Sequence, residues 1–267
     1  MRQKDCIAVI ERFAYPAAAA SWDASGMQVA GLRDDVRRVA VCLDPTPASV
    51  SAALDGGADF ILSHHPLLLK GRLPSRPDAY HAVLRRLLRA DVPLYAAHTS
   101  LDVNVYGPAG WLADELGLTN RTVLEPVGHD APQGPLGYGL AGDLPEALPP
   151  AELARALGRH IDLSTAVICG TPPALVRRVS YCTGSGSSMW PAAAALGADV
   201  HITGDVKYHT ALDADICMID VGHHSLEEEM MRRMALLLAG ELPGTDVFFV
   251  PSASPLRPLA DAADSRF

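Results

Sequence analysis

The sequence predicts an α/β protein built from two copies of one α/β unit, and two pairs of matching segments carry this prediction. "VRRVAVCLD" (36–44) matches "VRRVSYCTG" (176–184) at an offset of 140 residues. "GADFILSHH" (57–65) matches "GADVHITGD" (197–205) at the same offset, without a gap. A constant offset across separated segments indicates an internal duplication. We therefore expect two α/β lobes related by a pseudo-twofold, with a three-layer α/β/α character.

In each copy the matched segments flank a predicted helix. An apolar β-branched run comes first, a helix-compatible stretch follows, and Gly-Ala-Asp then leads into a second apolar run. This order is typical of β-α-β units. In the first copy, Thr46 and Pro47 suit the N-cap and the first position of that helix.

A third match continues the duplication beyond the second strand of each copy. "HTSLD" (98–102) and "HHSLE" (223–227) both read His-x-Ser-Leu-acid, at an offset of 125 residues. The offset is smaller because the first copy carries extra chain around "KGRLPSRPDAYHAVLRRLLRA" (70–90). This extra segment predicts a loop followed by an amphipathic helix.

The segment between the copies is rich in glycine and proline. In "GHDAPQGPLGYGLAGDLPEALPPAEL" (128–153) we expect loops, a short strand over "YGLAGDL", and a helix that begins near Pro149 or Pro150. Placing the boundary at the start of this segment gives a first lobe over residues 1–127 and a second over 128–267. The two lobes are expected to pack closely together.

A long C-terminal helix is predicted over residues 225–239. Ser225 suits the N-cap and Glu228 lies three residues further on, which is the pattern of a capping box. Methionines and leucines recur along one face from Met230 to Leu238, and Gly240 suits the end of the helix. This apolar face is expected to join the core.

Composition narrows the class of protein. The chain has 267 residues, 49% hydrophobic and 20% charged, with a formal net charge of −9, so we expect folded lobes and no broad binding to nucleic acid. Its five cysteines are scattered without a CxxC pair, which is typical of buried thiols in a reducing compartment. The N-terminal residues lack the pattern of a signal peptide, and no uncharged apolar run is long enough to cross a membrane. We expect a soluble, cytoplasmic protein without membrane contact.

Histidines and acids gather where predicted strands end. "SHHP" (63–66) closes an apolar run, and the two His-x-Ser-Leu-acid motifs each follow another. Ligands of open α/β sheets bind beyond the carboxyl ends of the strands, so the three motifs predict a site in the crevice between the lobes. Imidazole and carboxylate donors suit Zn, Mn or Fe(II). More than four candidate ligands indicate two metal ions, which together polarise a substrate oxygen and supply a hydroxide near neutral pH.

A structural role remains open for each of these histidines taken singly, and the metal prediction depends on the three motifs together. His201 falls within a predicted strand and is expected to pack in the core. His209 lies near the second-copy counterpart of the His-His loop, where it could support a ligand or shuttle protons. The sequence lacks Gly-x-Ser-x-Gly and a complete phosphate-loop or dinucleotide fingerprint, so a serine hydrolase or a nucleotide fold of those classes is not indicated.

The motifs resemble, in family order over nearly the whole chain, the NIF-three-like family, also described as type 2 GTP cyclohydrolase-like or dinuclear-metal hexameric proteins. The matching stretches are "WDASGMQVAG" (22–31), "ADFILSHHPLL" (58–68), "YAAHTSLDVN" (95–104), "CTGSGSS" (182–188), "ADVHITGDVKYH" (198–209) and "IDVGHHSLEE" (219–228). The resemblance implies two α/β lobes, a toroidal homo-hexamer and two divalent metal ions per chain. The metal ligands that it implies are His64, His65, Asp102, His223 and Glu227.

The resemblance also places His98 beside the metals as a candidate for proton transfer, and we assign the catalytic role to His98 and His209. Two motifs depart from the family pattern. The first motif usually reads Trp-Asp-Asn-x-Gly, where this chain has Ala24 and Ser25, and a tyrosine usually follows the last histidine, where this chain has His224.

The leading functional hypothesis is a metal-dependent hydrolase of a nucleotide or another small anionic substrate, with GTP ring opening as the candidate reaction. The alternative is a non-enzymatic metal-binding hexamer that acts as a scaffold or regulatory partner. Both hypotheses use the same ligands, and open coordination positions would favour the enzyme.

Overall fold

In the computed structural model, which describes residues 1–259, the chain divides into two compact units. Unit 1 comprises Met1–Pro108 and Met230–Ser252, and unit 2 comprises Ala109–Glu229 with the described residues from Ala253 onward. The predicted boundary at 127/128 therefore differs from the structural one at Pro108/Ala109. The C-terminal helix also returns the chain to unit 1, after Glu229.

Unit 1 contains a five-stranded sheet of order β1-β4-β3-β2-β11. Strands β2, β3, β4 and β11 are parallel, and β1 pairs with β4 in the antiparallel direction at one edge. The strands are β1 (Gly26–Val29), β2 (Arg38–Cys42), β3 (Phe60–Ser63), β4 (Leu94–Ala96) and β11 (Asp246–Phe249). The helices are α1 (Gln3–Ile10), α2 (Pro47–Asp55), α3 (Ala79–Ala90), α4 (Thr99–Asp102) and, from Met230, the C-terminal part of α9 (His223–Glu241).

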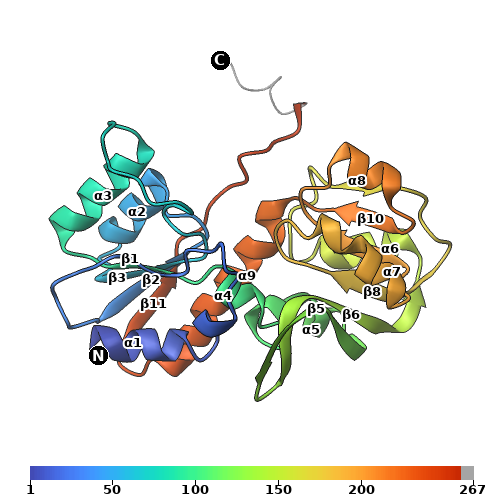
Figure 1. The fold of residues 1–267 in the computed structure, drawn as a ribbon, viewed down its shortest axis with the longest axis horizontal. Helices are drawn as coiled ribbons and strands as arrows, with labels where there is room; N and C mark the ends of the chain where they lie inside the picture. The colour runs from blue at the N-terminus through green and yellow to red at the C-terminus, as the bar shows by residue number, and fades with distance from the viewer. Residues whose placement is uncertain (260–267) are drawn as a thin grey trace. The chain divides into compact units, whose positions relative to one another are not determined.

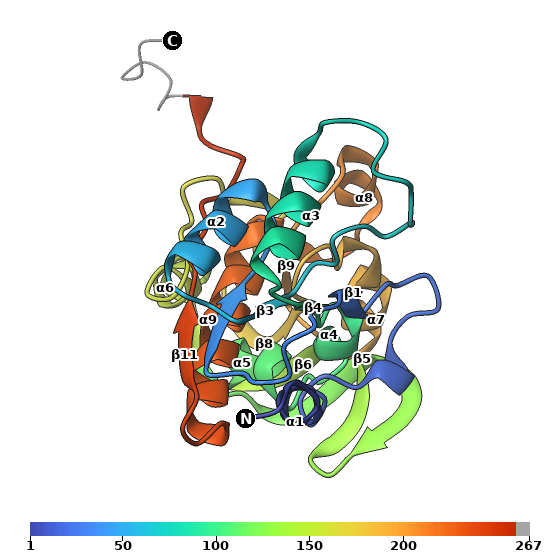
Figure 2. The same cartoon turned by 90° about the vertical axis from the view of Figure 1, so that its left-hand side faces the viewer.

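Helices cover both faces of this sheet, as the three-layer prediction requires. Alternate strand residues such as Ala40 and Ile61 pack against Val50 of α2 and Leu87 of α3. Figures 1 and 2 show α1 and α9 on the opposite face. The predicted apolar face of α9 is buried at Met230, Met231, Met234 and Leu238.

The predicted start of α2 is confirmed. Thr46 is the N-cap, Pro47 is the first helical residue, and the Thr46 hydroxyl accepts a hydrogen bond from the Ser49 amide at 3.1 Å. The Ser49 hydroxyl in turn accepts from the Thr46 amide at 2.9 Å, which completes a capping box.

Unit 2 contains a six-stranded sheet of order β5-β6-β8-β9-β10-β7. Its strands are β5 (Thr119–Ala131), β6 (Gly134–Leu148), β7 (Val167–Cys169), β8 (Val176–Tyr181), β9 (Val200–Thr203) and β10 (Cys217–Asp220). Its helices are α5 (Trp111–Glu115), α6 (Pro150–Leu157), α7 (Trp190–Ala195), α8 (Tyr208–Asp213) and the first residues of α9. Ala193 of α7 packs against Met218 of β10 in the core.

The predicted duplication is confirmed by strand register. Val39 pairs with Phe60 between β2 and β3, and Val179 pairs with Val200 between β8 and β9, so both partners are shifted by the sequence offset of 140 residues. The acid of each Gly-Ala-Asp has a matching role. Asp59 accepts from the amide of Arg38 at 2.9 Å, and Asp199 accepts from the amide of Arg178 at 2.9 Å.

The middle segment differs from its prediction, because β5 and β6 form one long antiparallel hairpin where loops and a short strand were expected. Its glycines lie where the strands approach closely. A Cβ atom on Gly137 would come within 2.3 Å of the Glu125 carbonyl oxygen, and Gly139 has a positive φ of 65°. Glycine richness here therefore reflects close packing of two strands.

The described part of the chain, residues 1–259, contains no helix with the length and apolar composition that a bilayer crossing needs.

His201 is buried in β9, as predicted, and makes the stability of unit 2 depend on pH. Its Nε2 donates to the Gly186 carbonyl at 3.1 Å, and its Nδ1 lies 3.0 Å from the Ser180 hydroxyl. Burial lowers the pKa of His201 to about 4, although the hydrogen bond to Gly186 opposes this effect.

An unfolded histidine takes up its proton near pH 6.5, whereas native His201 stays neutral until about pH 4. The free energy of unfolding should therefore fall as the pH drops through this window, by about 2 kcal/mol between pH 7 and pH 5. Urea unfolding of the wild type and His201→Gln at both pH values measures this share. An identical pH dependence in the two proteins would contradict the assignment.

Candidate metal centre

Three histidines of unit 1 converge at the carboxyl ends of two adjacent parallel strands. His64 and His65 follow β3, and His98 follows β4. The ring centroids are 5.0 Å apart for His64 and His65, 5.2 Å for His64 and His98, and 5.4 Å for His65 and His98. One nitrogen of each ring lies within 4.8 Å of the others, a spacing that could hold a metal ion. Adjacent His64 and His65 therefore both contribute to this group.

The Nδ1 atom of each ring in this group is fixed by an oxygen of the protein. His64 Nδ1 lies 2.8 Å from the Ala97 carbonyl oxygen, His65 Nδ1 lies 2.7 Å from Asp44 Oδ1, and His98 Nδ1 lies 2.7 Å from Asp23 Oδ1. A carbonyl or an ionised carboxylate only accepts hydrogen bonds, so each Nδ1 carries a hydrogen. In the neutral rings Nε2 then has the lone pair that a metal requires.

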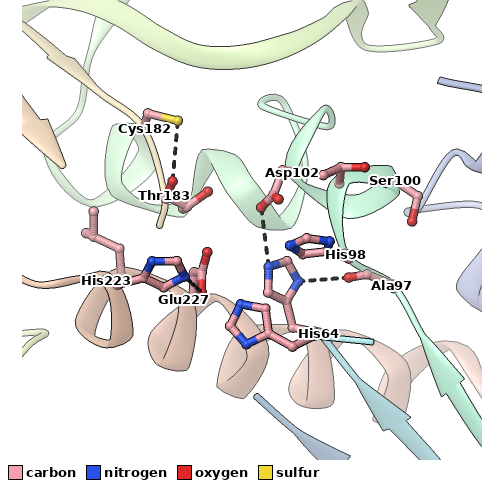
Figure 3. A network of polar contacts seen from close by, with 12 residues as sticks. His64, Ala97, His98, Ser100, Asp102, Cys182, Thr183, His223 and Glu227 are labelled. Carbon is pink, nitrogen blue, oxygen red and sulfur yellow. Dashed lines mark hydrogen bonds and ion pairs between the residues drawn. The ribbon is translucent and has the colours of Figure 1, made fainter. Parts of the chain in front are cut away.

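Asp102 brings a carboxylate to the same group. It is the last residue of α4, the short helix that begins directly after His98. Its Oδ1 is 3.6 Å from His64 Nε2 (Figure 3). Unit 1 therefore holds three imidazoles and one acid, and among them are all the ligands that the sequence predicted in this unit.

Asp23 holds His98 in place from the loop before β1. Its carboxylate accepts from the Ser25 hydroxyl at 2.6 Å and from the Thr99 hydroxyl at 2.5 Å, besides its contact with His98. Burial opposes ionisation of this acid, but the hydrogen bonds from His98, Ser25 and Thr99 outweigh it and lower the pKa of Asp23 below the usual range. The Ser25 hydroxyl also accepts from the His98 amide at 3.1 Å, so Ser25 holds the backbone of His98 beside this loop.

Unit 2 holds the second ligand pair at the start of α9. His223 Nε2 lies 3.0 Å from Glu227 Oε2, one helical turn along (Figure 3). His223 Nδ1 lies 2.7 Å from Asp205 Oδ2. The hydrogen bond to Glu227 raises the pKa of His223 to about 9, against the opposing effect of burial, and Asp205 adds to the rise. Without a metal, the His223 proton occupies the nitrogen that faces Glu227, and a cation bound there would replace this proton.

Two glycines explain why the second copy lacks counterparts of His64 and Asp44. Gly204 corresponds to His64, and a Cβ atom there would lie 2.4 Å from the His223 amide nitrogen. Gly184 corresponds to Asp44, and a Cβ atom there would lie 2.1 Å from Glu227 Oε1. The start of α9 thus occupies the space that these side chains fill in the first copy.

Gly184→Ala is therefore expected to displace the Glu227 carboxylate and to weaken metal binding by at least about tenfold, as loss of support for a ligand typically does. The added methyl group would also lie 3.3 Å from His223 Nε2. Isothermal titration with Zn²⁺ measures the effect.

Gly197→Ala is the matched control, because Gly197 also has a positive φ, of 75° against 61° for Gly184, yet has no atom within 4 Å of its Cβ position. Both variants share the backbone strain of a non-glycine residue at positive φ. Equal metal affinities of the two variants would contradict the proposed position of Glu227.

Ser225 does not cap the last helix as predicted. Helix α9 begins at His223, and the Ser225 hydroxyl donates to the Asp162 carbonyl oxygen at 3.3 Å from inside the first turn. The earlier start places His223 and Glu227 on one face of the helix, four residues apart.

His209 lies exposed on α8, where its ring centroid is 5.3 Å from that of Tyr208. Its catalytic role stays a prediction.

Sequence reasoning missed the acids that anchor the histidine rings, namely Asp23, Asp44 and Asp205. Asp44 and Asp205 end two of the matched segments, and Asp23 belongs to the "WDASG" motif, so their positions beside strand ends were the available signal.

Comparison with known proteins shows which family the chain belongs to. The family model described as Duf34/NIF3 (NGG1p interacting factor 3) matches residues 1–255. The chain belongs to the Duf34/NIF3 family. A family member from Streptococcus pneumoniae, named GTP cyclohydrolase 1 type 2 homolog, is 32% identical over 250 residues, which cover 89% of this chain and 91% of that protein.

A Pseudomonas aeruginosa protein of the same name is 35% identical over 211 residues, which cover 76% of this chain and 79% of that protein. The crystal structure of a Bacillus cereus protein related to NIF3 superimposes with a TM-score of 0.85 at 22% identity, covering 97% of this chain and 98% of that one. This structural likeness establishes the fold.

Proposed function

We propose that this Duf34/NIF3 protein binds two divalent metal ions and hydrolyses a nucleotide or another small anionic substrate. The proposed ligands are His64, His65 and Asp102 of unit 1 with His223 and Glu227 of unit 2. The observation that carries the proposal is the anchoring of Nδ1 in the three ligand histidines, His64, His65 and His223, by protein oxygens. Such anchoring is the usual support of metal-bound histidines, because it fixes the ring and leaves Nε2 for the metal.

The donor types fit a borderline divalent cation. Imidazole nitrogens with carboxylate oxygens suit Zn, Mn and Fe(II). Bound ions of this kind would supply Lewis-acid chemistry toward a substrate oxygen. Asp44, Asp23 and Asp205 would hold the rings of His65, His98 and His223 in orientation during turnover.

His98 is proposed to move a proton at its Nε2 atom. Asp23 fixes the opposite nitrogen of the ring, so that Nε2 is the atom left to exchange a proton with substrate. GTP is the first substrate to test, because relatives carry the name GTP cyclohydrolase 1 type 2 homolog. The proposal extends to a homo-hexamer, which light scattering can assess.

The test compares chelator-stripped protein with samples reloaded with Zn²⁺, Mn²⁺ or Fe²⁺, each incubated with GTP and a panel of nucleotides. Product formation followed by chromatography should require the reloaded metal. Tight metal binding without turnover of any nucleotide would favour the non-enzymatic metal-binding scaffold.

A further inference from the structure

The segment that the second copy lacks forms a basic surface on unit 1. Between β3 and β4 the chain runs through residues 64–93, whereas the equivalent connection between β9 and β10 spans only 204–216. Residues 70–90 of the longer connection contain six lysines and arginines and one acid, Asp78, in a chain of net charge −9. The basic surface consists of Lys70, Arg72, Arg76, Arg85, Arg86 and Arg89.

A groove runs along α3 within this surface, where Figure 2 shows α2 and α3 side by side. The groove has a volume of about 670 Å³. Arg85, Arg86 and Arg89 line it together with His81, and its apolar lining includes Leu54 and Ala82. A second hollow of about 660 Å³, lined by Arg72 and Arg76, shares Asp78 with the first.

The positive charge of the groove is not balanced by acids of the described chain. Asp78 accepts from Arg72 at 2.7 Å and from the His81 amide at 3.0 Å, so its carboxylate is already engaged as the N-cap of α3. Within residues 1–259, Arg85, Arg86 and Arg89 form no ion pair with an acidic side chain. Their guanidinium groups can therefore pair with carboxylates of another molecule.

The apolar lining indicates which anion fits. A phosphate or a nucleic-acid backbone needs cations alone, and a single strand also needs open aromatic rings on which bases stack. The Tyr80 ring is already covered by Arg72, whose guanidinium carbon lies 4.7 Å from the ring centroid. An amphipathic acidic peptide matches both parts of the groove, with apolar side chains on Leu54 and Ala82 and carboxylates on the arginines.

We propose that the groove between α2 and α3 binds an acidic amphipathic peptide segment of a partner protein. This site is independent of the metal centre, since its lining residues include none of the proposed ligands.

The experiment measures binding of a fluorescein-labelled helical peptide with glutamates and leucines at i, i+3 and i+4 spacing, at physiological ionic strength. A peptide with glutamine in place of each glutamate should bind the wild-type protein at least about tenfold more weakly. The glutamate peptide should lose affinity to the same extent for the triple variant Arg85→Glu/Arg86→Glu/Arg89→Glu. The matched control is Lys4→Glu/Arg37→Glu/Arg177→Glu, which changes exposed residues elsewhere by the same net charge and should bind like wild type. Circular dichroism and thermal unfolding establish that each variant is folded.

Ala82→Gln separates a peptide from other anions, because it fills the apolar lining without changing the charge. It should weaken peptide binding at least about tenfold. Failure of the wild type to bind the peptide would overturn the proposal, as would equal losses in the two triple variants. Binding of oligouridylate that Ala82→Gln leaves unchanged would assign the groove to nucleic acid instead. A change of oligomer mass in the arginine variant would assign it to a second copy of the chain.

Discussion

Glu227→Ala is expected to lower the affinity for divalent metal by more than about 100-fold, which exceeds the 10- to 100-fold loss typical of groups that only support a ligand. Glu227 is 3% exposed and its carboxylate lies 3.0 Å from His223 Nε2. The variant removes one proposed ligand and the acid that holds the second. Metal content after dialysis, measured on the same sample as circular dichroism, reports the loss in a folded protein.

Glu228→Ala is the matched control, since Glu228 occupies the next position of α9 and lies 3.7 Å from His224 Nε2 instead. It should keep the metal content of the wild type. Full metal content in Glu227→Ala, or an equal loss in both variants, would remove Glu227 from the set of ligands.

His98→Gln is expected to lower turnover by about 10²- to 10⁴-fold, the usual contribution of a general acid or base. Metal content should stay close to that of the wild type. The first copy already offers His64, His65 and Asp102, and the Nδ1 atom of His98 is held by the buried Asp23 carboxylate at 2.7 Å. Turnover of the nucleotide that the wild type consumes is measured together with metal content.

The outcome separates three roles, because His98 also belongs to the group of rings that could hold a metal. Loss of a metal ion from His98→Gln would make it a ligand. Full metal with full activity would give it neither role. His129→Gln, which changes an exposed histidine of β5, controls for loss of an imidazole in general.

Much of the fold could be predicted because the duplication appears in the sequence as a constant offset. The segments at 36–44 and 176–184 contain β2 and β8, and the Gly-Ala-Asp acids accept from equivalent backbone amides, those of Arg38 and Arg178. The Thr46 and Pro47 start of α2 depends on neighbouring residues, so the sequence reveals it.

The unit boundary and the hairpin could not be predicted, because they depend on contacts far apart in sequence. Pairing of β5 with β6 draws residues 119–131 into unit 2, although the first copy seemed to continue through them. The apolar face of α9 after Glu229 packs in unit 1, which no local pattern shows. Ser225 had the pattern of a cap, but its hydroxyl binds Asp162 more than sixty residues away.

The sequence pointed to the histidines of the candidate site, but its prediction missed the acids that orient their rings. Strand-end position and the repeated motif made these residues candidates, and the family resemblance gave the proposed ligand set of His64, His65, Asp102, His223 and Glu227. Asp23, Asp44 and Asp205 act through the rings that they orient, and such contacts depend on three-dimensional placement.

Elemental analysis of the wild-type chain tests the central claim most directly. The protein is stripped with a chelator, reloaded separately with Zn²⁺, Mn²⁺ or Fe²⁺, and dialysed before metal and protein are quantified. The proposed ligand set predicts about two ions per chain for at least one of these metals, as expected of a dinuclear site. Trace occupancy with all three metals would contradict the metal centre on which the proposed function depends.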